Sequence, residues 1–150
     1  GVEMVSTKKD KRAMFIKLLV VLLVISVMVM MSAGLSSQAQ QNVDLEIVVE
    51  NGCPVEVNDL SNSCESSGQG GQGVACATAG ATVLHWSSSG GEEFSINFKD
   101  QSPLGSSRNY SSNPEGKLTA PIPASAEAGN YDYGVSVGDC EMDPRIIVTK

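Results

Sequence analysis

The side chains best suited to metal or redox chemistry in this chain are four cysteines, a single histidine and a methionine near the C-terminus. The cysteines are Cys53, Cys64, Cys76 and Cys140, the histidine is His85, and the methionine is Met142. A structural zinc site needs closely spaced cysteine and histidine ligands, and these cysteines form no C-x-x-C pairs. No zinc site is therefore expected. The sequence contains neither a catalytic serine motif nor a Cys–His pair with a plausible third member, so it does not predict an enzyme.

Two other patterns resemble ligand sites only in part. Asp139, Glu141 and Asp143 alternate across a short segment and offer oxygens to Ca²⁺, but the glycine-spaced loop of a calcium motif is missing. The glycines of Gly68–Gly73 follow a G-x-G-G-x-G spacing without the Lys-Ser/Thr or the helix of a phosphate-binding loop. The residues thus predict no metal, no cofactor and no catalytic site.

The even number of cysteines predicts two disulfides if the protein is exported. Three pairings are possible for four cysteines. Cys64 and Cys76 flank a glycine-rich segment that cannot order itself by packing and would benefit from a local link. We therefore favour Cys64–Cys76, which leaves Cys53–Cys140.

An N-terminal apolar run decides on which side of a membrane the rest of the chain folds. Leu18–Met31 is interrupted only by Ser26, and the basic residues upstream of it favour a cytoplasmic N-terminus. Two interpretations stay open for residues 1–39: a signal peptide cleaved after Ala39, where small residues occupy the −3 and −1 positions, or a transmembrane anchor over Ala13–Leu35. Both place residues 40–150 outside the cytoplasm as one domain, periplasmic or extracellular, released or tethered to the cytoplasmic membrane.

The exported part is strongly acidic. Of the 17 acidic and ten basic residues, 15 and five lie in residues 40–150, which gives this part a net charge of −10. Such a domain repels phosphate backbones and anionic headgroups, so nucleic-acid binding is not expected. The charge fits either simple solubility or a basic protein partner.

The residue alternation of the exported part predicts strands and no helix. The clearest segments are Val43–Glu50, Ala81–Trp86, Phe94–Phe98, Tyr131–Val137 and Arg145–Thr149, with shorter ones at Pro54–Asn58 and Leu118–Ile122. Asp59–Val74 and Asp100–Gly116 are predicted as polar loops, and Ala81–Trp86 and Phe94–Phe98 as a hairpin. About seven strands predict an all-β, antiparallel sandwich, cupredoxin-like or Ig-like, preceded by one hydrophobic helix. The predicted core residues are Trp86, Phe94, Ile96, Phe98, Tyr131 and Tyr133, whereas His85 faces away from Trp86.

The order of these segments resembles the cupredoxin-like family, specifically the plastocyanin-like exported domains of bacteria. The resemblance covers most of residues 43–150. It rests on a glycine turn before V-x-H-W at Ala79–Trp86, on F-S-I-N-F at Phe94–Phe98, and on G-N-Y-D-Y-G-V-S-V at Gly129–Val137 followed by D-P-R-I-I-V at Asp143–Val148. It implies a type 1 copper set of two histidines, a cysteine and a weak methionine. This chain has Asn97 at the implied first histidine and Val135 at the implied cysteine, so the resemblance implies the fold without the copper chemistry. It also implies that Cys53 lies near Cys140.

Three functions from different classes follow from these observations. The leading hypothesis is a non-catalytic exported sandwich that binds another protein, as a tethered accessory subunit of a membrane complex or as an envelope component. The first alternative is a secreted copper-handling or redox protein that uses Cys140 and Met142 as soft ligands, which requires a reduced cysteine. The second is a carbohydrate-binding or adhesive module, which requires exposed aromatic side chains.

Overall fold

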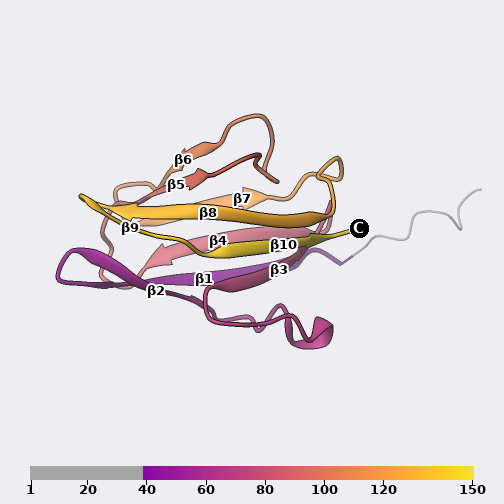
Figure 1. Ribbon diagram of the computed structural model, residues 1–150, viewed down its shortest axis with the longest axis horizontal. Coiled ribbons are helices and arrows are strands. Elements are labelled where there is room, and N and C mark those ends of the chain that lie inside the picture. Colours follow the sequence, from indigo (N-terminus) through magenta and orange to yellow (C-terminus); the bar gives the residue numbers. More distant parts are fainter. Residues whose placement is uncertain (1–38) are drawn as a thin grey trace, which may run out of the picture. The chain divides into compact units, whose positions relative to one another are not determined.

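The computed structural model describes residues 39–150, and these form a sandwich of two β-sheets (Figure 1). The first sheet has the order β2-β1-β4-β7, and the second, six-stranded sheet has the order β3-β10-β8-β5-β6, with β9 paired to β8. The strands are β1 Gln41–Glu50, β2 Cys53–Asp59, β3 Val74–Thr78, β4 Thr82–Ser88, β5 Ser95–Phe98, β6 Asn109–Ser111, β7 Lys117–Pro121, β8 Gly129–Val137, β9 Cys140–Met142 and β10 Arg145–Thr149. A single 3-10 turn, η2 at Glu65–Ser67, interrupts the loop between β2 and β3.

The all-β sandwich predicted from the alternation is confirmed, and the structure adds detail to it. Two strand pairs, β1 with β4 and β3 with β10, run parallel, so the sandwich is mixed rather than wholly antiparallel. Among residues 39–150 no helix has the length and hydropathy needed to cross a bilayer. The predicted hydrophobic helix and the basic region before it lie outside the described residues.

The predicted hairpin between Ala81–Trp86 and Phe94–Phe98 is wrong. β4 pairs with β1 and β7, whereas β5 pairs with β6 and β8 in the other sheet. Both strands send one apolar face into the same core, and alternation cannot distinguish two strands side by side from two strands facing each other across a core. The segment between them therefore crosses from one sheet to the other.

Three strands lie within or beside segments that the sequence predicted as loops or left unassigned. β3 turns only Ala75 and Ala77 inward, and these small side chains give a weak apolar signal. β6 and β9 have three residues each, which is too short for a period of two to be visible. Each of the three pairs with a strand that the alternation predicted: β3 with β10, β6 with β5, and β9 with β8.

The core between the sheets is built from the inward side chains of both layers. Trp86 of β4 is 1% exposed, and its indole Nε1 donates to the hydroxyl of Tyr133 of β8 at 3.3 Å. The two rings meet edge to face with centroids 6.3 Å apart, and Tyr133 in turn packs against Phe98. The other predicted core residues are also buried: Phe94, Ile96, Phe98 and Tyr131.

Both predicted disulfides are confirmed. Cys53 at the start of β2 is bonded to Cys140 at the start of β9, so this link joins the two sheets at one end of the sandwich. Cys64 is bonded to Cys76 and closes the loop between β2 and β3. No free cysteine is found among residues 39–150.

Candidate functional site

The positions implied for copper ligands do not fit a copper site. Asn97 pairs in register with Gly134 and is exposed on the outer face of its sheet, whereas Val135 is fully buried on the inner face. Asn97 and Val135 therefore lie on opposite sides of the sheet, and neither of them is a histidine or a cysteine. Cys140 is held in a disulfide and Met142 packs against the core.

The acidic segment after β8 does not assemble a cation site either. Asp143 pairs with the ammonium group of Lys99 at 2.8 Å, and within residues 39–150 no three carboxylate, imidazole or thiol groups gather around one point. Nearby, the Arg145 guanidinium donates to both carboxylate oxygens of Asp132, at 2.6 and 3.2 Å. This contact holds the pKa of Asp132 below its ordinary value. Lys99 and Arg145 are thus each engaged by a neighbouring acid.

His85 lies on the outer face of the first sheet, as the alternation predicted. Its Nδ1 is 3.0 Å from the hydroxyl of Thr119, and its Nε2 is 3.4 Å from the side-chain oxygen of Asn42. A shallow groove of about 390 Å³ surrounds it, with Asp44 and Leu60 on one side and Lys117 on the other. Both ring nitrogens face neutral oxygen atoms, and no cysteine or serine nucleophile contacts the ring among these partners, so the arrangement is that of a polar surface residue.

Acidic residues gather on the outer surface of β1 and β2. The chain from residue 40 to residue 98 contains eight acidic residues and no lysine or arginine. The register of β1 with β2 pairs Glu46 with Asn58 and Val48 with Glu56 on one face, and the amide of Leu60 donates to the carbonyl of Asp44. We call these six residues the β1–β2 face: Asp44, Glu46, Val48, Glu56, Asn58 and Leu60.

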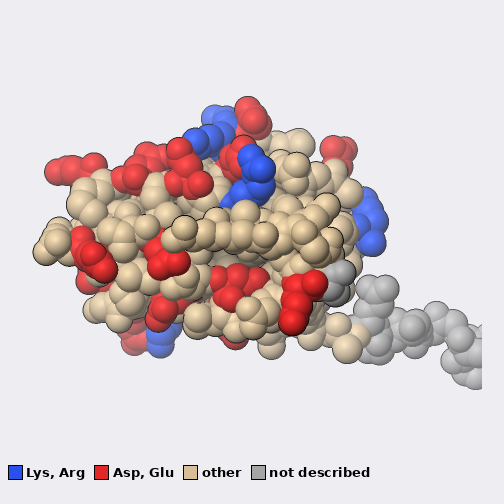
Figure 2. Space-filling model, turned by 60° about the horizontal axis from the view of Figure 1, so that its bottom comes forward, with Lys and Arg blue, Asp and Glu red and all other residues tan. Residues whose placement is uncertain are grey.

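The β1–β2 face combines negative charge with exposed apolar side chains. Leu60 is 59% exposed, and Val55, at the bulge of β2, is 47% exposed. The nearest cation of this sheet, Lys117, lies on β7 at the opposite edge and pairs with Glu115 at 3.8 Å. In Figure 2, acidic side chains are spread across the view and basic ones lie mainly toward its upper part. This surface is therefore electrostatically suited to a cationic partner.

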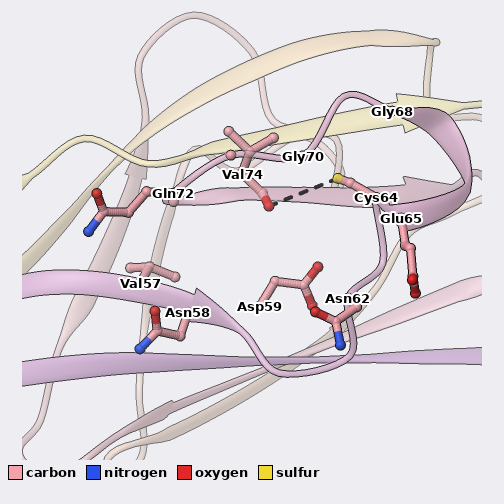
Figure 3. Close-up of a pocket in the computed structure, with 12 residues that line it drawn as sticks. Val57, Asn58, Asp59, Asn62, Cys64, Glu65, Gly68, Gly70, Gln72 and Val74 are labelled. Atoms are coloured by element: carbon pink, nitrogen blue, oxygen red, sulfur yellow. Dashed lines mark hydrogen bonds between the residues drawn. The ribbon is translucent and has the colours of Figure 1, made fainter.

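A pocket of about 550 Å³ lies beside the end of β2, under the glycine-rich loop (Figure 3). We call it the loop pocket. Asp59 and Asn62 point toward each other in its centre, and Asn58 and Gln72 lie at one end. Val57, Cys64 and Val74 supply its apolar walls. The rest of its lining is Glu65, Gly68, Gly70, Gly71 and Gly73.

The loop that forms this pocket is held in place by Asp59 and by the Cys64–Cys76 disulfide. The Asp59 carboxylate accepts hydrogen bonds from the amides of Ser61 and Ser63, at 3.0 and 2.6 Å, and from the Ser63 hydroxyl at 2.6 Å. The Ser63 hydroxyl oxygen in turn accepts the amide of Cys76 at 2.8 Å. The predicted polar loop is thus held by defined hydrogen bonds, and the Asp-x-Ser-x-Ser spacing, typical of local side-chain to backbone hydrogen bonds, is the signal that could have indicated them.

Comparisons with known proteins identify no family for this chain. No protein-family model matches the chain, and no curated protein matches it. Solved structures that match include a reduced mutant of amicyanin at 14% identity and a TM-score of 0.39, and a second amicyanin mutant, the reduced Cu(I) form at pH 4, at 13% and 0.40. A third amicyanin mutant, also Cu(I), matches at 12% and 0.39, and each match covers 78% of this chain and 88% of the other. At these identities and TM-scores, the likeness supports no conclusion about the fold, the family or the function of this chain.

Proposed function

We propose that this protein is a non-catalytic exported β-sandwich that binds another protein as an accessory or structural subunit, and that it docks through the β1–β2 face. The observation that carries the proposal is the separation of charge along the chain. Eight acidic residues and no basic ones lie between residues 40 and 98, and strand pairing brings three of these acids, Asp44, Glu46 and Glu56, to one side of the first sheet. The partner surface is accordingly basic.

The apolar residues within the β1–β2 face support docking rather than solubility alone. A purely solubilising face needs no exposed leucine, whereas interfaces commonly combine a few apolar anchors with a charged surround. Leu60 and Val48 lie among Asp44, Glu46 and Glu56, which matches that composition. Charge complementarity would steer the encounter, and the apolar side chains would contribute affinity.

The reactive side chains of the domain support a role without catalysis. All four cysteines are consumed in disulfides, and both nitrogens of His85 face neutral oxygens. We further propose that residues 1–39, if retained, hold the domain at the cytoplasmic membrane beside a larger complex. This part of the proposal rests on the apolar run and the basic residues before it.

The test is crosslinking of the full-length protein in membranes of its source cells, followed by mass spectrometry of the adduct. A triple variant of the β1–β2 face, Asp44→Asn, Glu46→Gln and Glu56→Gln, is compared with a control of equal charge change away from that face. The control carries Asp100→Asn, Asp139→Asn and Glu141→Gln. We expect one adduct with the wild type and the control, formed with a protein of basic surface, and its loss in the triple variant.

Two outcomes contradict the proposal. Equal adduct yields from the triple variant and the control would show that the β1–β2 face is not the docking surface. No specific adduct from the wild-type chain would overturn protein binding itself.

A further inference from the structure

We propose that the loop pocket binds a lysine side chain of the partner and so provides the specific contact beside the β1–β2 face. This inference rests on the proposed function, because it supplies the partner that carries the lysine. The pocket borders that face, because Asn58 belongs to both and Gln72 of the pocket lining donates to the carboxylate of Glu56 on the face at 3.0 Å. A partner seated on β1 and β2 would therefore have the pocket within reach.

The charge of the pocket selects a cation. Two carboxylates, Asp59 and Glu65, lie in its lining together with three amide side chains, and none of its lining residues is basic. Glu56 extends the same negative region, because its carboxylate accepts a hydrogen bond from Gln72 at 3.0 Å. Asp59 is occupied by the serine hydrogen bonds of the loop, which leaves Glu65 as the carboxylate open to a ligand.

The walls of the pocket select a cation with an apolar stem. Val57 is 2% exposed and Cys64 is 4% exposed, and both lie in the pocket wall with Val74. The methylene groups of a lysine side chain can pack on such a wall while the ammonium group meets carboxylate, amide and carbonyl oxygens. A small inorganic cation would instead need several converging oxygen ligands, and no such group is found within residues 39–150.

The glycines make the pocket accessible to such a side chain. Gly70 and Gly71 have no side chains to fill the space. A Cβ at Gly71 would meet only the Val74 side chain at 3.8 Å, which is ordinary contact, and the backbone there is not left-handed. A larger residue at position 71 can therefore fill the pocket without straining the loop.

The experiment titrates the full-length protein in detergent micelles with a blocked peptide, acetyl-Gly-Lys-Gly-amide, and follows the backbone amide signals of the loop by NMR. The matched peptide has norleucine in place of lysine, which keeps the stem and removes the charge. We expect saturable shifts in the loop signals with the lysine peptide only. Glu65→Gln should weaken binding about three- to five-fold, as expected for one exposed charge pair.

The pocket-filling variant Gly71→Leu should abolish these shifts, while Gly129→Leu, at an exposed glycine of β8 with ordinary backbone angles, should leave them unchanged. Equal binding of the norleucine peptide, or unchanged binding by Gly71→Leu, would overturn the lysine site. If crosslinking to the partner persists while the lysine peptide causes no shifts, the lysine site fails and the docking face stands. If the wild type gives no adduct, both fail.

Discussion

Replacing Trp86 with alanine should remove a large part of the stability of the domain. Truncation of a large buried aromatic side chain costs about 3–5 kcal/mol. The cost should lie at the top of this range, because Trp86 is 1% exposed and its edge-to-face contact with Tyr133 adds about 0.5–1.5 kcal/mol. The Tyr133 hydroxyl would also lose the Nε1 donor at 3.3 Å and remain buried without it. Since domains of this size are stable by about 5–15 kcal/mol, about 5 kcal/mol is a severe loss.

The assay is urea unfolding followed by far-ultraviolet circular dichroism, because Trp86 is the single tryptophan and its removal eliminates the fluorescence signal. His85→Ala is the matched control: it is the adjacent residue on the opposite face, is partly exposed, and should cost less than about 1 kcal/mol. Trp86→Phe and Tyr133→Phe, singly and together, isolate the hydrogen bond, with an expected coupling of about 0.5–1.5 kcal/mol. Equal losses for Trp86→Ala and His85→Ala would refute the assignment of the two faces of β4.

Three other predictions concern the disulfides, alkaline pH and copper. Removing the Cys53–Cys140 disulfide should lower the free energy of unfolding by about 4.6 kcal/mol, and removing Cys64–Cys76 by about 2.8 kcal/mol, from the chain entropy at separations of 87 and 12 residues. The urea midpoints of the two double-alanine variants check this order, and the reverse order would contradict it. Burial raises the pKa of Tyr133 above its ordinary value near 10, so above about pH 10 the unfolded chain loses this proton before the folded one. The free energy of unfolding should therefore fall as pH rises above about 10, by up to about 1.4 kcal/mol per pH unit. Tyr133→Phe should make this fall with pH less steep, and an equally steep fall in that variant would show that other groups cause it. The purified protein should stay colourless with Cu(II), because Cys140 is in a disulfide, and an intense visible thiolate-to-copper absorption would contradict this.

Alternation in the sequence was enough to predict the longer strands and their inward faces. Val43, Leu45 and Ile47 in β1, like Tyr131 and Tyr133 in β8, are separated by polar residues, and the structure buries each of them. Alternation could not assign a strand to a sheet, because β4 and β5 both face the one core. The pairing partners of a strand depend on contacts between segments that are distant in the sequence, and the local alternation of residues does not indicate which segments these are.

The loop pocket shows a different limit of sequence-based prediction. Its glycines and amides predict a polar surface loop, and the predicted Cys64–Cys76 disulfide was the one feature expected to hold this loop in place. The pocket depends on the Asp59 carboxylate, which accepts three hydrogen bonds from two serines. It also depends on the Ser63 hydroxyl, which accepts a hydrogen bond from the amide of Cys76 in β3. Such a network is a property of three-dimensional positions, although the Asp59-x-Ser61-x-Ser63 spacing is compatible with it.

The position of β10 between β3 and β8 has a consequence for how the chain reaches its native state. β3 is complete at residue 78, but its hydrogen-bonding partner begins at Arg145, so the edge of the second sheet stays unpaired until the last residues are present. Folding that waits for contacts this distant in sequence is slow, because the loop-closure entropy must be lost before the pairing compensates for it. If the chain is exported, as its N-terminal segment predicts, this late pairing would keep the second sheet incomplete until residues 145–149 are available. Truncation of the last six residues should accordingly yield a protein that aggregates through β3 and β8 rather than a shortened sandwich.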